Sequence, residues 1–314
     1  MTGPILVARG DELLRYSFPS PHPLGRQRLE RFYQMLDSEK LGYVRYVKPV
    51  KATRETITLF HTERYVSFVE KMSEVGSGYL DYGDTPAFPG CYEAAAYVVG
   101  TTIHLLDKVL DEGVKAFNPM GGLHHARRDR AGGFCIFNDA GVAIEYLLRK
   151  AGITNVAYID IDAHHGDGVC YEFYDDDRLI FADIHQDGRT LYPGTGFRDE
   201  TGTGKARGLK LNIPIPPFSS DEEFFNAFRE VENFLEGHRF DFILFQCGAD
   251  GVEGDPITSL QYSPKAHSYA ARRLAEIADR KCGGRVLAMG GGGYNPDNVG
   301  RAWLAVVKGL AGEV

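Results

Sequence analysis

Aspartate and histidine side chains are concentrated between residues 160 and 167, in the sequence Asp-Ile-Asp-Ala-His-His-Gly-Asp. Asp162 and His164 are two positions apart, so their side chains point to the same side of an extended segment. A carboxylate and an imidazole together suit Zn²⁺ or another borderline divalent ion. Asp250 lies far away in the sequence but at an equivalent strand end, where it can supply a third ligand. Three protein ligands leave one position open for water, as in catalytic zinc sites. Each residue alone fits a helix cap or a core histidine, but the set favours a metal site.

A pair of adjacent histidines, His124 and His125, follows two glycines, which allow the backbone to approach another group closely. Beside a metal, such a pair can deprotonate a bound water and protonate a leaving group. Asp160 and Asp167 are the nearby carboxylates that can fix the two tautomers. The alternative interpretation is a tandem histidine pair on a surface loop.

Four consecutive glycines at 290–293 precede Tyr294. A phosphate-binding loop is one interpretation, but the run lacks the G-x-x-x-x-G-K-[ST] and G-x-G-x-x-G spacings. We favour glycines that bring Tyr294 over a ligand. Its hydroxyl can then donate to a carbonyl oxygen as negative charge develops there.

Apolar runs and segments of helical period alternate along the chain and explain how these clusters meet. Buried strands are predicted over 114–118, 156–160, 179–184, 209–213, 242–248 and 285–290. Helices are predicted over 92–110, 139–150, from 221 onward, 264–281 and 296–310. The clusters follow the carboxyl ends of strands, where open parallel sheets bind ligands. Since composition does not shift along the chain, we expect one three-layer αβα domain over 1–314 with a mostly parallel central sheet.

The net charge of −8 from 35 basic and 43 acidic residues argues against nucleic-acid binding and favours a neutral or cationic substrate. Five cysteines without a C-x-x-C pair indicate neither a disulfide framework nor a thiolate zinc site. The first residues lack the apolar core of a signal peptide, and no apolar run is long enough to span a membrane. We therefore expect a cytoplasmic protein that binds no membrane.

The chain resembles the zinc-dependent histone deacetylase superfamily, above all its bacterial members, which include acetoin-utilisation proteins and acetylpolyamine amidohydrolases. The resemblance begins near Tyr16, includes His22-Pro23 and Arg28, and covers nearly the whole chain. It rests on the stretches 121–126, 133–139, 158–168, 192–196, 248–250, 254–256 and 290–295. It implies an arginase/deacetylase-like fold.

The resemblance implies the same roles as the residue chemistry. Asp162, His164 and Asp250 match the zinc ligands. His125 matches the general base, oriented by Asp167. His124 matches its electrostatic partner, oriented by Asp160, and Tyr294 matches the tyrosine that polarises the acyl carbonyl.

The resemblance also implies a substrate channel. Phe134 and Tyr192 match the walls that hold the methylene stem of an acylated amine. The carbonyl of Gly133 matches an acceptor for the scissile amide N–H, and Asp84 matches a rim aspartate that holds the substrate backbone.

The implied cofactors are one Zn²⁺ per chain, with Fe²⁺ also compatible with the ligands, and a structural K⁺ held through Asp160, Asp162 and His164. Related binuclear manganese hydrolases need further carboxylates at positions that here are Gly166 and Val252, so we expect one catalytic metal. Asp183 stands where many relatives have serine, with an effect on the K⁺ site that the sequence does not define.

We therefore expect a metal-dependent amidohydrolase that removes acetyl or other short acyl groups from lysine side chains of proteins or peptides. One alternative is an acetylpolyamine deacetylase. The shape of the channel rim would distinguish an enzyme for small polyamines from one for protein lysine. A second, less favoured, is a non-catalytic acyl-lysine-binding module. The sequence does not define the acyl-chain preference or the oligomeric state, and it is compatible with a homo-oligomer.

Overall fold

The computed structural model describes residues 3–313. The strands are β1 (Ile5–Ala8), β2 (Val44–Val47), β3 (Lys115–Asn118), β4 (Val156–Asp160), β5 (Leu179–Gln186), β6 (Lys210–Ile215), β7 (Phe242–Gln246) and β8 (Val286–Met289). The helices are α1 (Asp11–Leu14), α2 (Gln27–Glu39), α3 (Arg54–Ile57), α4 (Glu63–Val75), α5 (Cys91–Glu112), α6 (Asp139–Arg149), α7 (Asp167–Glu172), α8 (Asp221–Glu236), α9 (Pro264–Lys281) and α10 (Pro296–Leu310).

The strands form one sheet in the order β2-β1-β3-β8-β7-β4-β5-β6, and every neighbouring pair is parallel. The mostly parallel α/β sheet that the sequence predicts is confirmed. The order places β3, β8, β7 and β4 side by side at the centre. Their carboxyl ends, at Asn118, Met289, Gln246 and Asp160, therefore lie along one stretch of the same sheet edge.

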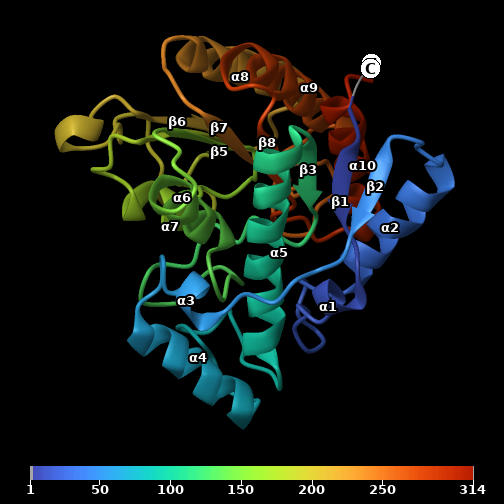
Figure 1. Cartoon of the computed structure of the whole chain (residues 1–314), viewed down its shortest axis with the longest axis vertical. Coiled ribbons are helices and arrows are strands. Elements are labelled where there is room, and N and C mark those ends of the chain that lie inside the picture. The colour runs from blue at the N-terminus through green and yellow to red at the C-terminus, as the bar shows by residue number, and fades with distance from the viewer. Residues whose placement is uncertain (1–2, 314) are drawn as a thin grey trace.

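Helices cover both faces of this sheet, which gives three layers (Figure 1). On one face α10 packs on α2 and α9, and α9 also packs on α8. On the other face the long helix α5 packs against α6, and α6 contacts α7. The buried apolar residues of all three layers form one continuous core. A parallel sheet buried on both faces favours strands that are apolar along most of their length, as β1 (ILVA), β7 (FILFQ) and β8 (VLAM) are.

Local sequence signals explain the later helices. The Ser220 side chain caps α8, and Glu223 returns the bond to complete a capping box. The Asn295 side chain caps α10 by accepting the N–H groups of Asp297 and Asn298. The five cysteines are free and buried, in accord with the absence of a predicted disulfide framework.

The first 90 residues contain elements that the sequence did not predict. β1 and β2 have four residues each and extend the sheet beyond β3, and α1 to α4 also lie in this segment. The strand predicted over 242–248 ends at Gln246, because Cys247 and Gly248 already belong to the loop that leads to Asp250. No helix among residues 3–313 has the length and apolar content needed to cross a membrane. The single domain over 1–314 stays a prediction.

Candidate active site

Asp162, His164 and Asp250 lie together beyond the ends of β4 and β7. One ligand atom from each residue lies within 4.8 Å of the others, and among residues 3–313 this is the one such group of His, Cys, Asp and Glu side chains. The Nδ1 atom of His164 lies 3.1 Å from Asp162 Oδ1 and 2.9 Å from Asp250 Oδ2. All three residues are buried. The structure therefore brings the three predicted ligands to one point.

The surrounding backbone orients the two carboxylates. Asp162 Oδ2 accepts the Gly292 N–H at 2.8 Å and the Gln246 side-chain amide at 2.9 Å. Asp250 Oδ1 accepts the Ala163 N–H at 2.8 Å. Gly292 comes so close that a Cβ there would lie 2.2 Å from Asp250 Oδ2. The glycine run of 290–293 is thus needed at this point because no side chain fits against the carboxylates.

The charges of this group suit a divalent cation. Burial lowers the pKa of His164, but hydrogen bonds and charge from Asp162 and Asp250 outweigh burial and raise it to about 10. Two carboxylates this close and this deeply buried need a positive charge between them. Two carboxylates and one imidazole are also a donor set that Zn²⁺ and Fe²⁺ accept. The residues present therefore fit the metal that the sequence predicts.

The tandem histidines stand beside this group, each on its own carboxylate. His124 Nδ1 lies 2.8 Å from Asp160 Oδ2, and His125 Nδ1 lies 2.7 Å from Asp167 Oδ1. The two Nε2 atoms face each other at 3.0 Å. Arg127 donates to the second oxygen of Asp167 at 2.8 Å. The structure thus pairs each histidine with the carboxylate that the resemblance implies for it.

The environment shifts the pKa values of the two rings in opposite directions, so that one ring is positively charged and the other is neutral near pH 7. Burial lowers the pKa of His124, but Asp160 and Asp162 outweigh burial and raise it to about 10. Burial, followed by the adjacent charge of His124, lowers the pKa of His125 to about 4. His125 is therefore neutral near pH 7, with its Nδ1–H on Asp167 and its Nε2 as an acceptor. One imidazolium beside one imidazole is an arrangement suited to acid–base chemistry.

Tyr294 follows the glycine run and faces the same space. A small cavity of about 20 Å³, large enough for one water, is lined by His124, His125, Asp162, His164 and Tyr294 among other residues. Burial raises the pKa of Tyr294 well above its ordinary value, so the hydroxyl stays protonated and can donate. Asp255 fixes the backbone of Tyr294 by accepting its N–H at 2.7 Å.

The predicted channel residues lie next to residues that line this cavity, or line it themselves. The ring of Phe134 lies 5.7 Å from that of Tyr294, and the ring of Tyr192 lies 5.1 Å from that of His125, measured between centroids. Gly133 lines the cavity itself. Its φ of 52° and the approach of His125 Cδ2, 2.3 Å from where a Cβ would be, both require glycine.

Asp84 lies farther out than the other predicted site residues. It lines an open cavity of about 500 Å³ together with Asp81, Arg130 and Tyr192, and His125 lines both this cavity and the inner one. Burial, followed by the charge and hydrogen bonding of Asp81, raises the pKa of Asp84 to about 6. The structure therefore places Asp84 at a rim rather than next to the metal ligands.

Asp183, the residue with no predicted role, is buried beside the site. Its Oδ1 lies 2.7 Å from His185 Nδ1, and its Oδ2 accepts the Gly166 N–H at 2.8 Å. Burial lowers the pKa of His185, but Asp183 outweighs burial and raises it. The carboxylate is thus held by an imidazole and a backbone N–H.

Three supporting residues escaped the sequence interpretation. They are Gln246, Arg127 and Asp255, which contact Asp162, Asp167 and the Tyr294 backbone. Gln246 gave a usable signal, because a polar residue at the end of a buried strand usually meets a polar partner.

The family of histone deacetylase domains matches residues 22–310 of this chain. Because the match covers most of the chain, the protein belongs to the histone deacetylase family. The match confirms the resemblance that the sequence motifs indicated, and it supports the interpretation of the protein as a deacetylase.

Individual relatives agree with that assignment. The chain is 39% identical over 313 residues to "Acetoin utilization protein AcuC" of Bacillus subtilis, a match that covers 94% of this chain and 80% of the relative. It is 34% identical to a "Probable deacetylase" of Archaeoglobus fulgidus, over 96% of this chain and 85% of the relative. A solved structure described as an HDAC homolog complexed with SAHA superposes with a TM-score of 0.86 at 31% identity, over 99% of this chain and 85% of that one.

Proposed function

We propose that this protein is a zinc-dependent amidohydrolase that removes acetyl or other short acyl groups from lysine side chains of proteins or peptides. The observation that carries the proposal is the inner cavity. It is lined at once by metal-ligand candidates, by both histidines and by a protonated tyrosine. Hydrolysis adds water across the amide C–N bond and yields a free amine and a short carboxylic acid.

Asp162, His164 and Asp250 would hold one zinc ion, and Fe²⁺ fits the same donors. When bound, such an ion polarises the acyl carbonyl and lowers the pKa of a bound water to about 7. The proposal of a single catalytic metal rests on Gly166 and Val252, which offer no side-chain ligand where a second metal would need carboxylates.

His125 acts as the general base in this proposal. Its neutral ring has an acceptor at Nε2, and Asp167 holds the opposite nitrogen. The proton that His125 takes from water is then delivered to the departing amine nitrogen. His124, held by Asp160, stays positively charged and stabilises negative charge that develops beside it.

The remaining residues bind and orient the substrate. The Tyr294 hydroxyl donates to the carbonyl oxygen as it becomes negative, and the Gly133 carbonyl accepts the scissile N–H. Phe134 and Tyr192 enclose the methylene stem of the acylated amine. The carboxylate of Asp84 accepts backbone N–H groups of the substrate at the rim.

A structural K⁺ beside the catalytic metal is part of the same proposal. Asp160, Asp162 and His164 lie in one tight segment, where Asp160 Oδ1 accepts the Asp162 N–H at 3.1 Å. Asp160 and Asp183 are both buried, and the pKa of Asp160 rises to about 7 through burial and the nearby charge of Asp183, against the effect of His124. A monovalent cation would offset that concentration of negative charge.

The substrate is tested by assaying acetylated lysine peptides against acetylspermidine and acetylputrescine. We expect the peptides to have the higher kcat/KM, whereas a higher value for the polyamines would make the protein an acetylpolyamine deacetylase. His125→Ala is the control, and we expect almost no turnover from it because the base is missing. Peptide binding without turnover by the metal-loaded wild-type protein would instead indicate an acyl-lysine-binding module.

A further inference from the structure

Thr85 is a fully buried residue at the end of the rim loop, which we define as residues 81–85. Its side chain contacts the backbone of Phe134, the predicted channel-wall residue. Its hydroxyl donates to Asp84 Oδ1 at 3.0 Å and accepts the backbone N–H of Phe134 at 3.1 Å. A hydroxyl has one hydrogen and two lone pairs, so it can make both bonds at once. One side-chain oxygen therefore connects two predicted substrate-binding residues that are 50 positions apart in the chain.

The backbone of Thr85 is fixed independently of that hydroxyl. Its N–H donates to Asp81 Oδ1 at 3.0 Å, and its carbonyl accepts the Leu80 N–H at 2.9 Å. Asp81 Oδ1 also accepts the N–H groups of Gly83 at 2.9 Å and Asp84 at 3.1 Å. The rim loop is thus closed on itself around one carboxylate oxygen, and it presents the Thr85 hydroxyl in a defined position.

Phe134 needs such support because its backbone lies in the left-handed region. Its φ is 68°, a conformation that costs a non-glycine residue free energy. The Tyr16 hydroxyl donates to the Phe134 carbonyl at 2.8 Å and accepts the Ile136 N–H at 2.9 Å. Thr85 therefore binds the N–H of the Phe134 backbone, and Tyr16 binds its carbonyl.

We propose that Thr85 is a positioning residue that sets the rim carboxylate of Asp84 and the channel wall of Phe134 in fixed relation to each other. This fixed spacing between Asp84 and Phe134 would favour substrates in which a side chain of fixed length joins the acyl group to a peptide backbone. Such a substrate engages the wall and the rim together. The inference rests on the proposed acyl-lysine hydrolysis and adds a determinant of its specificity.

Thr85→Val tests this, because valine keeps the shape and removes the hydroxyl. Thr85→Ser is the matched variant that keeps the hydroxyl. The substrates are a tripeptide with a central acetyl-lysine and N-butylacetamide, which has the stem but no peptide backbone. For Thr85→Val we expect KM for the tripeptide to rise about tenfold with kcat within about twofold, and a smaller rise for N-butylacetamide. Thr85→Ser should restore the wild-type KM.

Thr101→Val controls for loss of a buried hydroxyl as such. Thr101 is equally buried in α5, where its hydroxyl accepts the Val50 N–H at 3.2 Å. We expect Thr101→Val to leave KM unchanged, with thermal melting confirming that both valine variants fold. The inference is overturned by an unchanged tripeptide KM in Thr85→Val, by an equal rise in Thr101→Val, or by a failure of serine to restore KM. A metal-loaded wild-type protein that hydrolyses neither substrate overturns the proposed function and this inference with it.

Discussion

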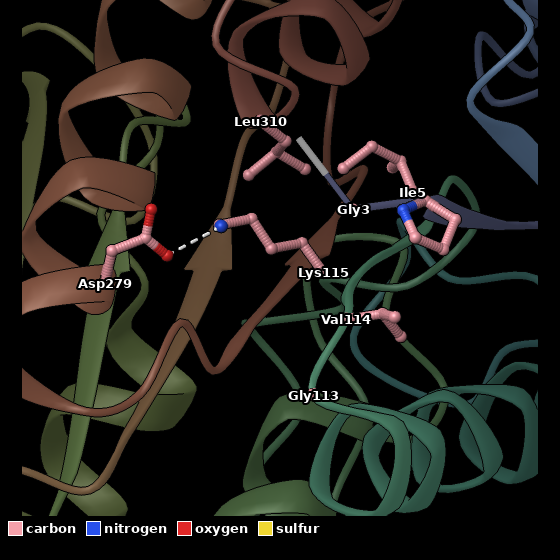
Figure 2. Close-up of a pocket in the computed structure, with 8 residues that line it drawn as sticks. Gly3, Ile5, Gly113, Val114, Lys115, Asp279 and Leu310 are labelled. Atoms are coloured by element: carbon pink, nitrogen blue, oxygen red, sulfur yellow. Dashed lines mark hydrogen bonds and ion pairs between the residues drawn. The ribbon is translucent and has the colours of Figure 1, made fainter. Parts of the chain in front are cut away.

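The two ends of the sheet carry cavities of opposite character. At the amino ends of β1 and β3 lies a cavity of about 380 Å³ (Figure 2), lined by Gly3, Pro4, Ile5, Gly113, Val114, Lys115, Asp279 and Leu310. Its charged side chains are Lys115 and Asp279, which form one ion pair at 2.8 Å with side chains 18% and 59% exposed. At the carboxyl ends, the open rim cavity of about 500 Å³ adjoins an inner cavity of about 20 Å³, which is lined by buried imidazoles, a carboxylate and a tyrosine.

The two ends therefore differ less in the volume of their cavities than in the burial and charge of the groups that line them. An ion pair in which one side chain stays largely in water contributes little to stability. The buried groups at the carboxyl end have lost their water, so each interaction between them is strong and each pKa is displaced. Perturbation at the two ends should therefore have very different effects.

Removal of metal should produce the largest effect. We expect chelation to abolish amide hydrolysis, and one equivalent of Zn²⁺, Co²⁺ or Fe²⁺ per chain to restore it. Activity titrated against added metal checks this, with metal content measured in parallel. Full activity only at two ions per chain would contradict the single-metal proposal.

Tyr294→Phe should have the next largest effect. The change removes one hydroxyl and keeps the ring, so the fold and the metal content should stay as in the wild type. We expect kcat for an acetyl-lysine peptide to fall by about 10²–10³ with little change in substrate binding. Near-normal turnover with zinc bound would mean that Tyr294 only packs beside the glycine run.

A moderate effect is expected from pH at the rim. The raised pKa of Asp84, about 6, means that its carboxylate is ionised at pH 7.5 and becomes protonated as the pH falls through 6. A protonated carboxyl accepts backbone N–H groups less well. KM for a peptide, divided by KM for N-butylacetamide, should therefore rise below pH 6. In Asp84→Asn, this ratio of KM values should change little with pH over the same range. If the ratio depends on pH as strongly as in the wild type, Asp84 does not contribute to peptide binding.

The smallest effect is expected at the amino end of the sheet. Lys115→Met keeps most of the aliphatic stem and removes the ion pair with Asp279. We expect the free energy of unfolding, measured by denaturant titration, to change by less than about 1 kcal/mol. The kcat/KM should equal that of the wild type. A clear loss of activity would show that the two ends of the sheet are coupled.

The parts of the fold that the sequence could predict are those encoded locally. The capped helices α8 and α10 and the long apolar strands carry their signals within a few residues. The four-residue strands β1 and β2 carry too little periodicity on their own, and they form strands because β3 offers β1 a partner and β1 in turn offers one to β2.

The residues of the candidate site can also be divided into those that local sequence reveals and those that depend on distant partners. Asp162, His164 and the tandem histidines are recognisable because the chemistry is concentrated in short stretches. Gln246, Asp255 and Thr85 act on residues that lie 39 to 84 positions away along the chain. Nothing in their local sequence specifies that distance, since it is set by the order of strands and by the path of the loops between them.

The strand order also governs when the site can exist during synthesis. His164 and Asp250 are 86 positions apart, and the Gly292 N–H that orients Asp162 comes 130 positions after it. A nascent chain that has passed only β4 and β5 carries two ligands without the third, and it lacks the tyrosine beyond β8. The candidate site can therefore be complete only after β8 and Tyr294 have been synthesised, because only then are all the groups that would bind a metal and a substrate present in the chain.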